Sequence, residues 1–192
     1  ADGKTATDKR TKFKGRSIVT GGKSAANRTL GFLGPLFEFA IDEGLRTDNP
    51  TRGVKKYKEG RPARFLSNSE IAKVGDALRA AEAAGVNPYA LAALRLLMLT
   101  GCRKNEILKL RWDEVDFEGG FLRLPDSKTG YKPVPVGAPV LSLLSELPRV
   151  AGNPFVIVGD LNGRHYVNLQ KVWAKVRTIG ELKDVRIHDL RH

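Results

Sequence analysis

The sequence predicts a mainly helical protein with a small antiparallel β-sheet, an α+β arrangement. Over most of the chain, apolar residues recur at helical spacing between glycines and prolines that end each segment. Only residues 115–136 change to short apolar runs separated by turn residues, which is typical of strands. With 192 residues, 41% of them hydrophobic, the chain can hold one domain with a buried core and part of another.

Positive charge is concentrated near the N-terminal end of the chain. The net charge is +12, and residues 1–66 carry 15 Lys and Arg against 7 Asp and Glu. Such an excess favours a polyanionic partner, most often nucleic acid. An exposed basic tail that only raises solubility is the alternative. No apolar run approaches the roughly 18 residues of a membrane span, so we expect no membrane partner.

Cys102, the single cysteine, lies in an apolar segment. It has no partner for an intramolecular disulfide, which fits a cytoplasmic location. No histidine is near it in the sequence, so we expect a small buried residue rather than a thiol nucleophile. The chain begins with Ala1 and shows no signal peptide, as expected for a piece that starts inside a longer protein.

The N-terminal third divides into three parts. Residues 1–23 have few apolar groups and are predicted to be a loosely packed basic lead-in. Residues 24–57 contain a helical pattern that begins at Ser24, the predicted cap, and ends at Gly44 and Asn49-Pro50, and Pro35 should kink or divide the helix. Residues 58–66 are a basic linker to a second domain.

Cationic side chains in and before this linker are candidates for contacts with DNA phosphates. They are Arg52, Lys55, Lys56, Lys58, Arg61 and Arg64. Few apolar residues lie between them, so we expect them to be exposed.

The second domain, residues 67–192, begins with clear helix signals. Ser67 and Glu70 form a capping box that predicts a helix to about Ala84. The next helix, residues 88–99, is apolar almost all round and is therefore the predicted core helix.

Shorter elements follow Gly101, which separates the core helix from a short helix with Arg103 and Glu106. Strands are predicted at 115–117, 121–124 and 132–136, and a further strand or extended segment at 155–158. Helices are predicted near 138–147, from Asn168 to about residue 179, and from His188 onward. Trp112 and Trp173 are predicted to be core aromatics rather than base-stacking groups.

Two arginines in short apolar contexts, Arg103 and Arg191, suggest a clamp for one phosphate. Cleaving a phosphodiester without a metal requires neutralising charge on the nonbridging oxygens and protonating the leaving oxygen. A guanidinium matches phosphate geometry and stays charged, and a lysine or histidine can supply the proton.

The segments around these arginines resemble the tyrosine recombinases, the phage-integrase family. Residues 100–108 are similar to the family's first box and residues 188–192 to its second box. Lys128, in a turn between two predicted strands, matches the β-hairpin lysine. Residues 27–50 resemble the last helices of the core-binding domain. The resemblance covers about residues 24–192 and implies the recombinase catalytic-domain fold, preceded by helices of a core-binding domain.

The resemblance also implies a role for each matching residue. Arg103 and Arg191 would hold the scissile phosphate, and Lys128 would protonate the leaving 5′-hydroxyl. His188 would hydrogen-bond the phosphate and assist proton transfer. His192 sits at a position that supports or contacts the active site.

Glu106 would orient the site, although it can also form a surface ion pair with Lys104 or Lys109. Lys132 is an alternative to Lys128, and His188 can be a plain helix cap.

In the family a tyrosine nucleophile follows the second box, and here no tyrosine does. The tyrosines are Tyr57, Tyr89, Tyr131 and Tyr166. We therefore expect residues 1–192 alone to form no phosphotyrosine intermediate.

For the parent protein the resemblance implies site-specific DNA recombination through a 3′-phosphotyrosine, as in phage or mobile-element integration. The enzyme would act as a homotetramer on double-stranded DNA, without cofactor or metal, and would be encoded by a bacterium or phage.

Two other functions remain open. The first is a catalytically inert DNA-binding fragment, and the second is a nonspecific basic nucleic-acid binder of another fold. A metal-dependent nuclease is disfavoured, because Asp and Glu are not clustered with His at ligand spacing.

Overall fold

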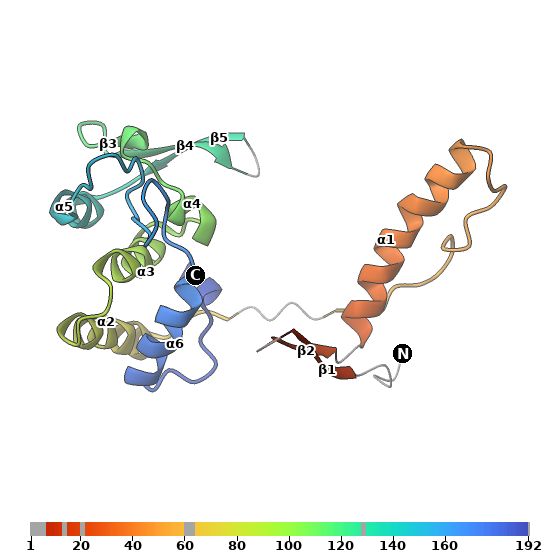
Figure 1. Cartoon of the computed structure of the whole chain (residues 1–192), viewed down its shortest axis with the longest axis horizontal. Helices are drawn as coiled ribbons and strands as arrows, with labels where there is room; N and C mark the ends of the chain where they lie inside the picture. The colour runs from red at the N-terminus through yellow and green to blue at the C-terminus, as the bar shows by residue number, and fades with distance from the viewer. Residues whose placement is uncertain (1–6, 13–14, 20–21, 60–63, 128–129, 192) are drawn as a thin grey trace. The chain divides into compact units, whose positions relative to one another are not determined.

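The computed structural model describes residues 7–12, 15–19, 22–59, 64–127 and 130–191 (Figure 1). The chain divides into two compact units, Ala1–Ala63 and Arg64–His192. Three predicted site residues, Arg61, Lys128 and His192, lie outside the described residues. Each unit is described by itself.

The first unit contains a β-hairpin and one long helix, α1 (Lys23–Asp42). Strands β1 (Thr7–Lys12) and β2 (Gly15–Val19) pair antiparallel, with Asp8 opposite Ile18. The hairpin corrects the expectation of a loosely packed lead-in, because pairing between backbone groups organises these residues despite their low apolar content.

Helix α1 differs from its prediction at two points. Gly22 occupies the N-cap position without a side-chain hydrogen bond, so Ser24 is not the cap. The helix continues through Pro35 instead of being divided there. A proline removes one backbone hydrogen bond, which is a local loss in a helix of 20 residues.

The helices of the second unit pack around α3 (Figure 1). They are α2 (Asn68–Ala83), α3 (Pro88–Thr100), α4 (Lys104–Leu108), α5 (Ala138–Glu146) and α6 (Leu169–Ile179). Seven residues of α3 are buried, as its apolar surface predicts. Cys102, just after α3, is also buried, which confirms its expected placement.

The predicted capping box of α2 and the predicted end of α3 at Gly101 are confirmed. Ser67 and Glu70 form a complete capping box at the start of α2. The Asn87 side chain accepts a hydrogen bond from the amide of Ala90 at 3.1 Å. Gly101 ends α3 in the left-handed conformation, with φ of 63°, which a glycine adopts without a steric penalty.

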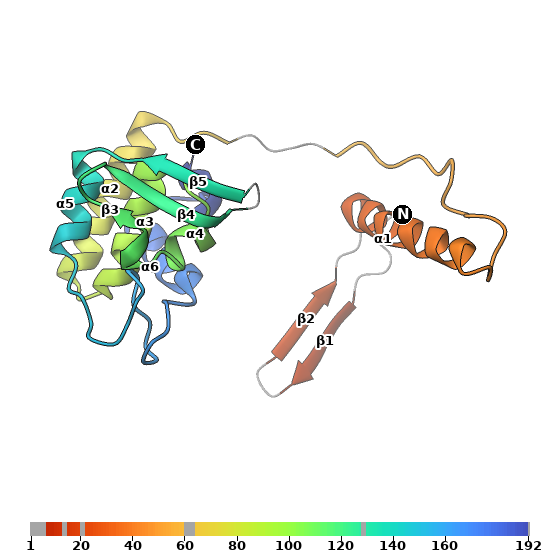
Figure 2. The same cartoon turned by 90° about the horizontal axis from the view of Figure 1, so that it is seen from above.

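The predicted antiparallel sheet has the strand order β3-β4-β5. Its strands are β3 (Val115–Asp116), β4 (Phe121–Ser127) and β5 (Gly130–Pro135), preceded by the 3₁₀ turn η1 (Trp112–Glu114). Leu122 lies opposite Val134, and both are buried, so this pair faces the core. Figure 2 shows β4 and β5 as a long hairpin beside α4.

The last elements of the second unit lead to His188 and Arg191, near the end of the described residues. Residues 155–158 form only isolated bridges, between Arg111 and Phe155 and between Val158 and His165. Asn168 precedes α6 with φ of 62° but makes no side-chain cap, which corrects its predicted role. The final element is the 3₁₀ turn η2 (Ile187–Arg191), where the sequence predicts a helix from His188.

Both tryptophans pack as predicted. Trp173 is buried, and Trp112 is partly buried against the same core. Among the described helices, none is long and apolar enough to cross a membrane.

Candidate phosphate-binding site

Arg103 stands at the junction between α3 and α4, directly before the first residue of α4. Its amide donates to Oε2 of Glu106 at 2.7 Å, and its Nη1 donates to Oε1 at 2.7 Å. The Glu106 side chain is 7% exposed and the Arg103 side chain 43%. A nearly buried carboxylate therefore fixes one edge of a guanidinium whose remainder reaches the surface.

Arg191, near the C-terminal end of the domain, also contacts the junction between α3 and α4. Its Nε donates to the carbonyl oxygen of Gly101 at 2.8 Å. Gly101 lies two residues before Arg103, so this bond brings the two predicted phosphate-binding arginines to one place. Two guanidinium groups that bind the same phosphate can neutralise its nonbridging oxygens.

A buried acid fixes the turn that carries His188. Asp189 is 1% exposed and accepts hydrogen bonds from the Arg186 amide at 2.8 Å and from Arg186 Nη2 at 2.7 Å. The Arg186 side chain lowers the pKa of the Asp189 carboxyl, although burial acts in the opposite direction. Ile187 and Asp189 point inward, whereas His188 between them is exposed. The turn therefore presents His188 to the surface.

Glu106 forms an ion pair with Arg103. The ion pair between Arg186 and Asp189 was not predicted from the sequence. Their spacing of three residues is the signal that could have found them, because a side chain at that distance can cap a short helical turn.

A hollow of about 370 Å³ opens beside Arg103. Its lining includes Lys109 from the end of α4, Glu114 from η1 and Leu124 from β4. Burial raises the pKa of the Glu114 carboxyl. The hollow places β4 next to Arg103, and Lys128 lies outside the described residues.

The basic residues around the linker have different surroundings. Arg52 donates from Nη2 to Oε2 of Glu38 at 2.9 Å. Arg64 forms an ion pair with Glu70 and donates from Nη1 to the carbonyl of Asp184 at 3.2 Å. The three lysines of the set are exposed: Lys55, Lys56 and Lys58.

Among the described residues, no group of three or more His, Cys, Asp and Glu is placed to hold a metal ion.

A model of the Phage integrase family matches residues 64–192, which is more than half of the chain. The chain therefore belongs to the phage integrase family. The matched residues coincide with the second compact unit and contain Arg103, His188 and Arg191.

Individual relatives agree with this assignment. The chain is 30% identical over 168 residues to a shufflon-specific DNA recombinase of Escherichia coli, covering 85% of this chain and 40% of that protein. It is 36% identical over 101 residues to a XerC-like tyrosine recombinase of Caldanaerobacter subterraneus subsp. tengcongensis, covering 48% of this chain and 24% of the relative.

The fold is similar to that of lambda integrase. A crystal structure of a lambda integrase tetramer bound to a Holliday junction matches with a TM-score of 0.65 and 21% identity. The match covers 89% of this chain and 53% of that one. The chain thus spans about half or less of the length of these proteins.

Proposed function

We propose that the chain contains most of the catalytic domain of a site-specific DNA recombinase. The observation that carries the proposal is the convergence of Arg103 and Arg191 at the junction between α3 and α4. Membership of the phage integrase family and the DNA recombinase from Escherichia coli support the same activity.

In the proposed reaction a tyrosine hydroxyl attacks the scissile phosphorus and gives its proton to His188, which assists proton transfer. The new bond is a 3′-phosphotyrosine, and the bond to the 5′-oxygen breaks. Arg103 and Arg191 stabilise the charge that grows on the nonbridging oxygens, and His188 donates a hydrogen bond to the phosphate. Lys128 delivers a proton to the leaving 5′-oxygen. The tyrosine comes from outside residues 1–192, since no tyrosine follows His188 in them.

The partner is double-stranded DNA, which the net charge of +12 favours. We place the exposed lysines Lys55, Lys56 and Lys58 on its phosphates, and we infer that the complete enzyme acts as a homotetramer. The tetramer of lambda integrase on a Holliday junction supports this assembly. The bacterial relatives favour action in a bacterial cytoplasm, on integrating or mobile DNA.

Formation of a covalent adduct tests the proposal. The protein from the complete reading frame is mixed with nicked duplexes tiled across the DNA on both sides of that frame, and adducts are resolved on denaturing gels. We expect an adduct on one duplex, and Arg103→Ala and Arg191→Ala should each slow its formation by roughly a hundredfold or more. Unimpaired adduct formation in both variants would overturn the assigned roles.

A binding experiment separates recognition from chemistry. Residues 1–192 alone should bind a mixed-sequence 40-base-pair duplex with an affinity that falls steeply as salt rises, and should form no adduct. An adduct from this chain alone would contradict a nucleophile outside it. An affinity that does not change with salt concentration would contradict the proposed phosphate contacts.

A further inference from the structure

The turn that carries His188 and Arg191 needs tertiary contacts to keep its conformation. It is a 3₁₀ turn of five residues, and such short turns are marginal without tertiary contacts. The preceding loop contains Glu181 and Asp184 at φ of 51° and 60°, which is unfavourable for residues other than glycine. Contacts from outside must therefore fix this segment.

Two of these contacts come from Trp173 and Gly101, and an ion pair within the segment adds to them. Trp173 Nε1 donates to the Val185 carbonyl at 3.0 Å. The Arg186–Asp189 pair closes the turn, and Arg191 reaches the carbonyl of Gly101.

A fourth contact comes from Arg64, the first residue of the second unit. Its Nη1 donates to the Asp184 carbonyl at 3.2 Å, and its Nη2 pairs with Oε1 of Glu70. Glu70 is itself fixed, since its Oε2 accepts from the Ser67 amide at 2.9 Å in the capping box of α2. One guanidinium thus bridges the rigid start of α2 and the end of the loop before η2.

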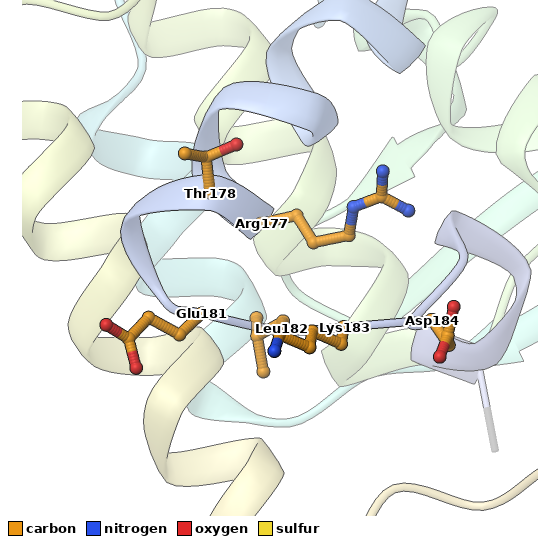
Figure 3. A pocket seen from close by; sticks show the side chains of 6 residues that line it. All are labelled: Arg177, Thr178, Glu181, Leu182, Lys183 and Asp184. Carbon is orange, nitrogen blue, oxygen red and sulfur yellow. The ribbon is translucent and has the colours of Figure 1, made fainter.

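Figure 3 shows this loop from Arg177 and Thr178 at the end of α6, past Leu182, to Asp184 beside the ribbon of η2. Cations and carboxylates alternate around the hollow there, with Arg177 and Lys183 beside Glu181 and Asp184. The hollow therefore has no single charge that would select a ligand. The contact between Arg64 and the backbone of Asp184 matters instead, because it holds the loop that leads to η2.

The charge of Arg64 also reaches the buried acid of the turn. Arg64 helps to lower the pKa of Asp189, after the larger effect of Arg186. Both Arg64 and Glu70 are partly buried, with 31% and 27% of their side chains exposed, so solvent screens the pair less than a surface pair.

We propose that Arg64 is a positioning residue, whose guanidinium holds the loop at Asp184 and thereby sets the turn that presents His188 and Arg191 to the DNA phosphate. This inference rests on the proposed function and differs from the sequence prediction, in which Arg64 is one of the DNA contacts of the linker. The two roles predict different behaviour when the side chain is removed.

Hydrogen exchange in the 192-residue chain measures the turn directly. The Asp189 amide donates to the Arg186 carbonyl at 3.0 Å within the turn. In Arg64→Ala we expect exchange at this amide to rise about tenfold, with amides of α3 unchanged, because only the local opening of the turn becomes easier. Arg64→Lys keeps the charge but reaches only one of the two partners, so its effect should be intermediate.

Adduct formation by the complete protein measures the consequence for the reaction. Arg64→Ala should slow cleavage about tenfold at saturating DNA, since misplaced catalytic groups lose rate rather than affinity. Its DNA affinity and salt dependence should stay within twofold of the original. Arg79→Ala is the matched control: it removes a surface ion pair with Asp76 on the same helix and should change neither exchange nor cleavage.

Each contrary result has a distinct meaning. If Arg64→Ala weakens binding and lowers the salt slope by about one, with exchange unchanged, Arg64 is a DNA contact and the proposal is wrong. Faster exchange with unimpaired cleavage also overturns it. If no duplex gives an adduct with the unaltered protein, the proposed function fails, while exchange still decides whether Arg64 holds the turn. Should Arg64→Ala unfold by circular dichroism, Arg64→Gln replaces it.

Discussion

Arg191 and Gly101, 90 positions apart in the sequence, are joined by a hydrogen bond from Nε of the arginine to the glycine carbonyl at 2.8 Å. This bond seats the end of the described chain on the C-terminal end of the core helix. Because Arg103 follows two residues after Gly101, one short stretch of backbone sets the position of both guanidinium groups. The proposed clamp thus depends on the left-handed turn at Gly101 as much as on the arginines.

Replacing this glycine should therefore have a catalytic effect beyond its cost in stability. Gly101→Ala and Gly85→Ala both place a side chain at a left-handed position, with φ of 63° and 70°, so each should lower the free energy of unfolding by about 1 kcal/mol. Only a Cβ at Gly101 would lie near Arg191, 3.7 Å from its carbonyl oxygen. We expect only Gly101→Ala to slow adduct formation. Equal rates in the two variants would contradict the role of this bond.

Glu106 should matter mainly through Arg103. Glu106→Gln keeps the cap on the Arg103 amide but loses the ion pair, so we expect about 1 kcal/mol lower stability in urea unfolding. Glu106→Ala leaves two donors of Arg103 without this acceptor and should cost about 2–3 kcal/mol. Both variants should slow adduct formation more than they weaken DNA binding.

Glu114 provides the control for this comparison. It caps η1 in the same way, accepting from the Arg111 amide at 2.9 Å, but it does not pair with Arg103. Glu114→Gln should leave adduct formation intact. A loss of activity equal to that of Glu106→Gln would show that capping alone, rather than the orientation of Arg103, explains the effect.

The stability of the chain in acid should depend on Asp189. The pKa of its carboxyl is lowered in the folded protein, chiefly by Arg186, so the unfolded chain binds a proton first as pH falls. The stabilisation is therefore present at pH values above the ordinary value of 3.8 and is lost as pH falls from there through the lower pKa of the folded protein. Asp189→Asn should be less stable at neutral pH and should show a shallower decline in unfolding free energy between about pH 4 and pH 2.

The surface variant Asp76→Asn, which breaks only the exposed pair with Arg79, serves as its reference. If Asp189→Asn and the original chain lose stability in parallel on acidification, the ion pair with Arg186 does not contribute as we expect.

The two tryptophans should respond differently to replacement by phenylalanine. Trp173→Phe removes the donor to the buried Val185 carbonyl and should cost about 1–3 kcal/mol for the hydrogen bond, in addition to lost packing. Among the described residues, the buried Nε1 of Trp112 has no hydrogen-bond partner. Trp112→Phe should therefore cost only packing and part of the stacking with Arg149, whose Cζ lies 4.4 Å from the ring centre.

Urea unfolding of both variants measures the difference between their free energies of unfolding. Trp173→Phe should be the less stable by at least about 1 kcal/mol. The opposite order would mean that the hydrogen bond from Trp173 to the loop before η2 contributes less than the packing that is lost at Trp112.

Local signals located most of the second unit correctly. The capping box of Ser67 and Glu70, the cap at Asn87 and the glycine stop at Gly101 depend on residues within a few positions of one another. The change of period between residues 115 and 136 marked the sheet for the same reason. Steric and hydrogen-bonding preferences over such short distances are present in the sequence itself.

Where neighbouring residues did not decide the outcome, the predictions were less accurate. The β1–β2 hairpin forms from a segment with few apolar residues, and α1 continues through Pro35. Asn168 begins α6 without capping it. At β1 and β2, pairing between the two strands organises a segment whose composition does not predict strands.

The sequence by itself determined the family and the chemical class of the candidate site. The arginines at positions 103 and 191, the lysine at 128 and the histidine at 188 lie in motifs that resemble those of the family, and the phosphate-binding centre that they predict is our proposal. The tertiary structure decided which groups hold them: Glu106 on Arg103, Gly101 on Arg191, and Arg64 on the loop at Asp184. The bonds of Arg191 and Arg64 join segments that meet only when η2 and α2 pack around α3, and no local spacing records that packing.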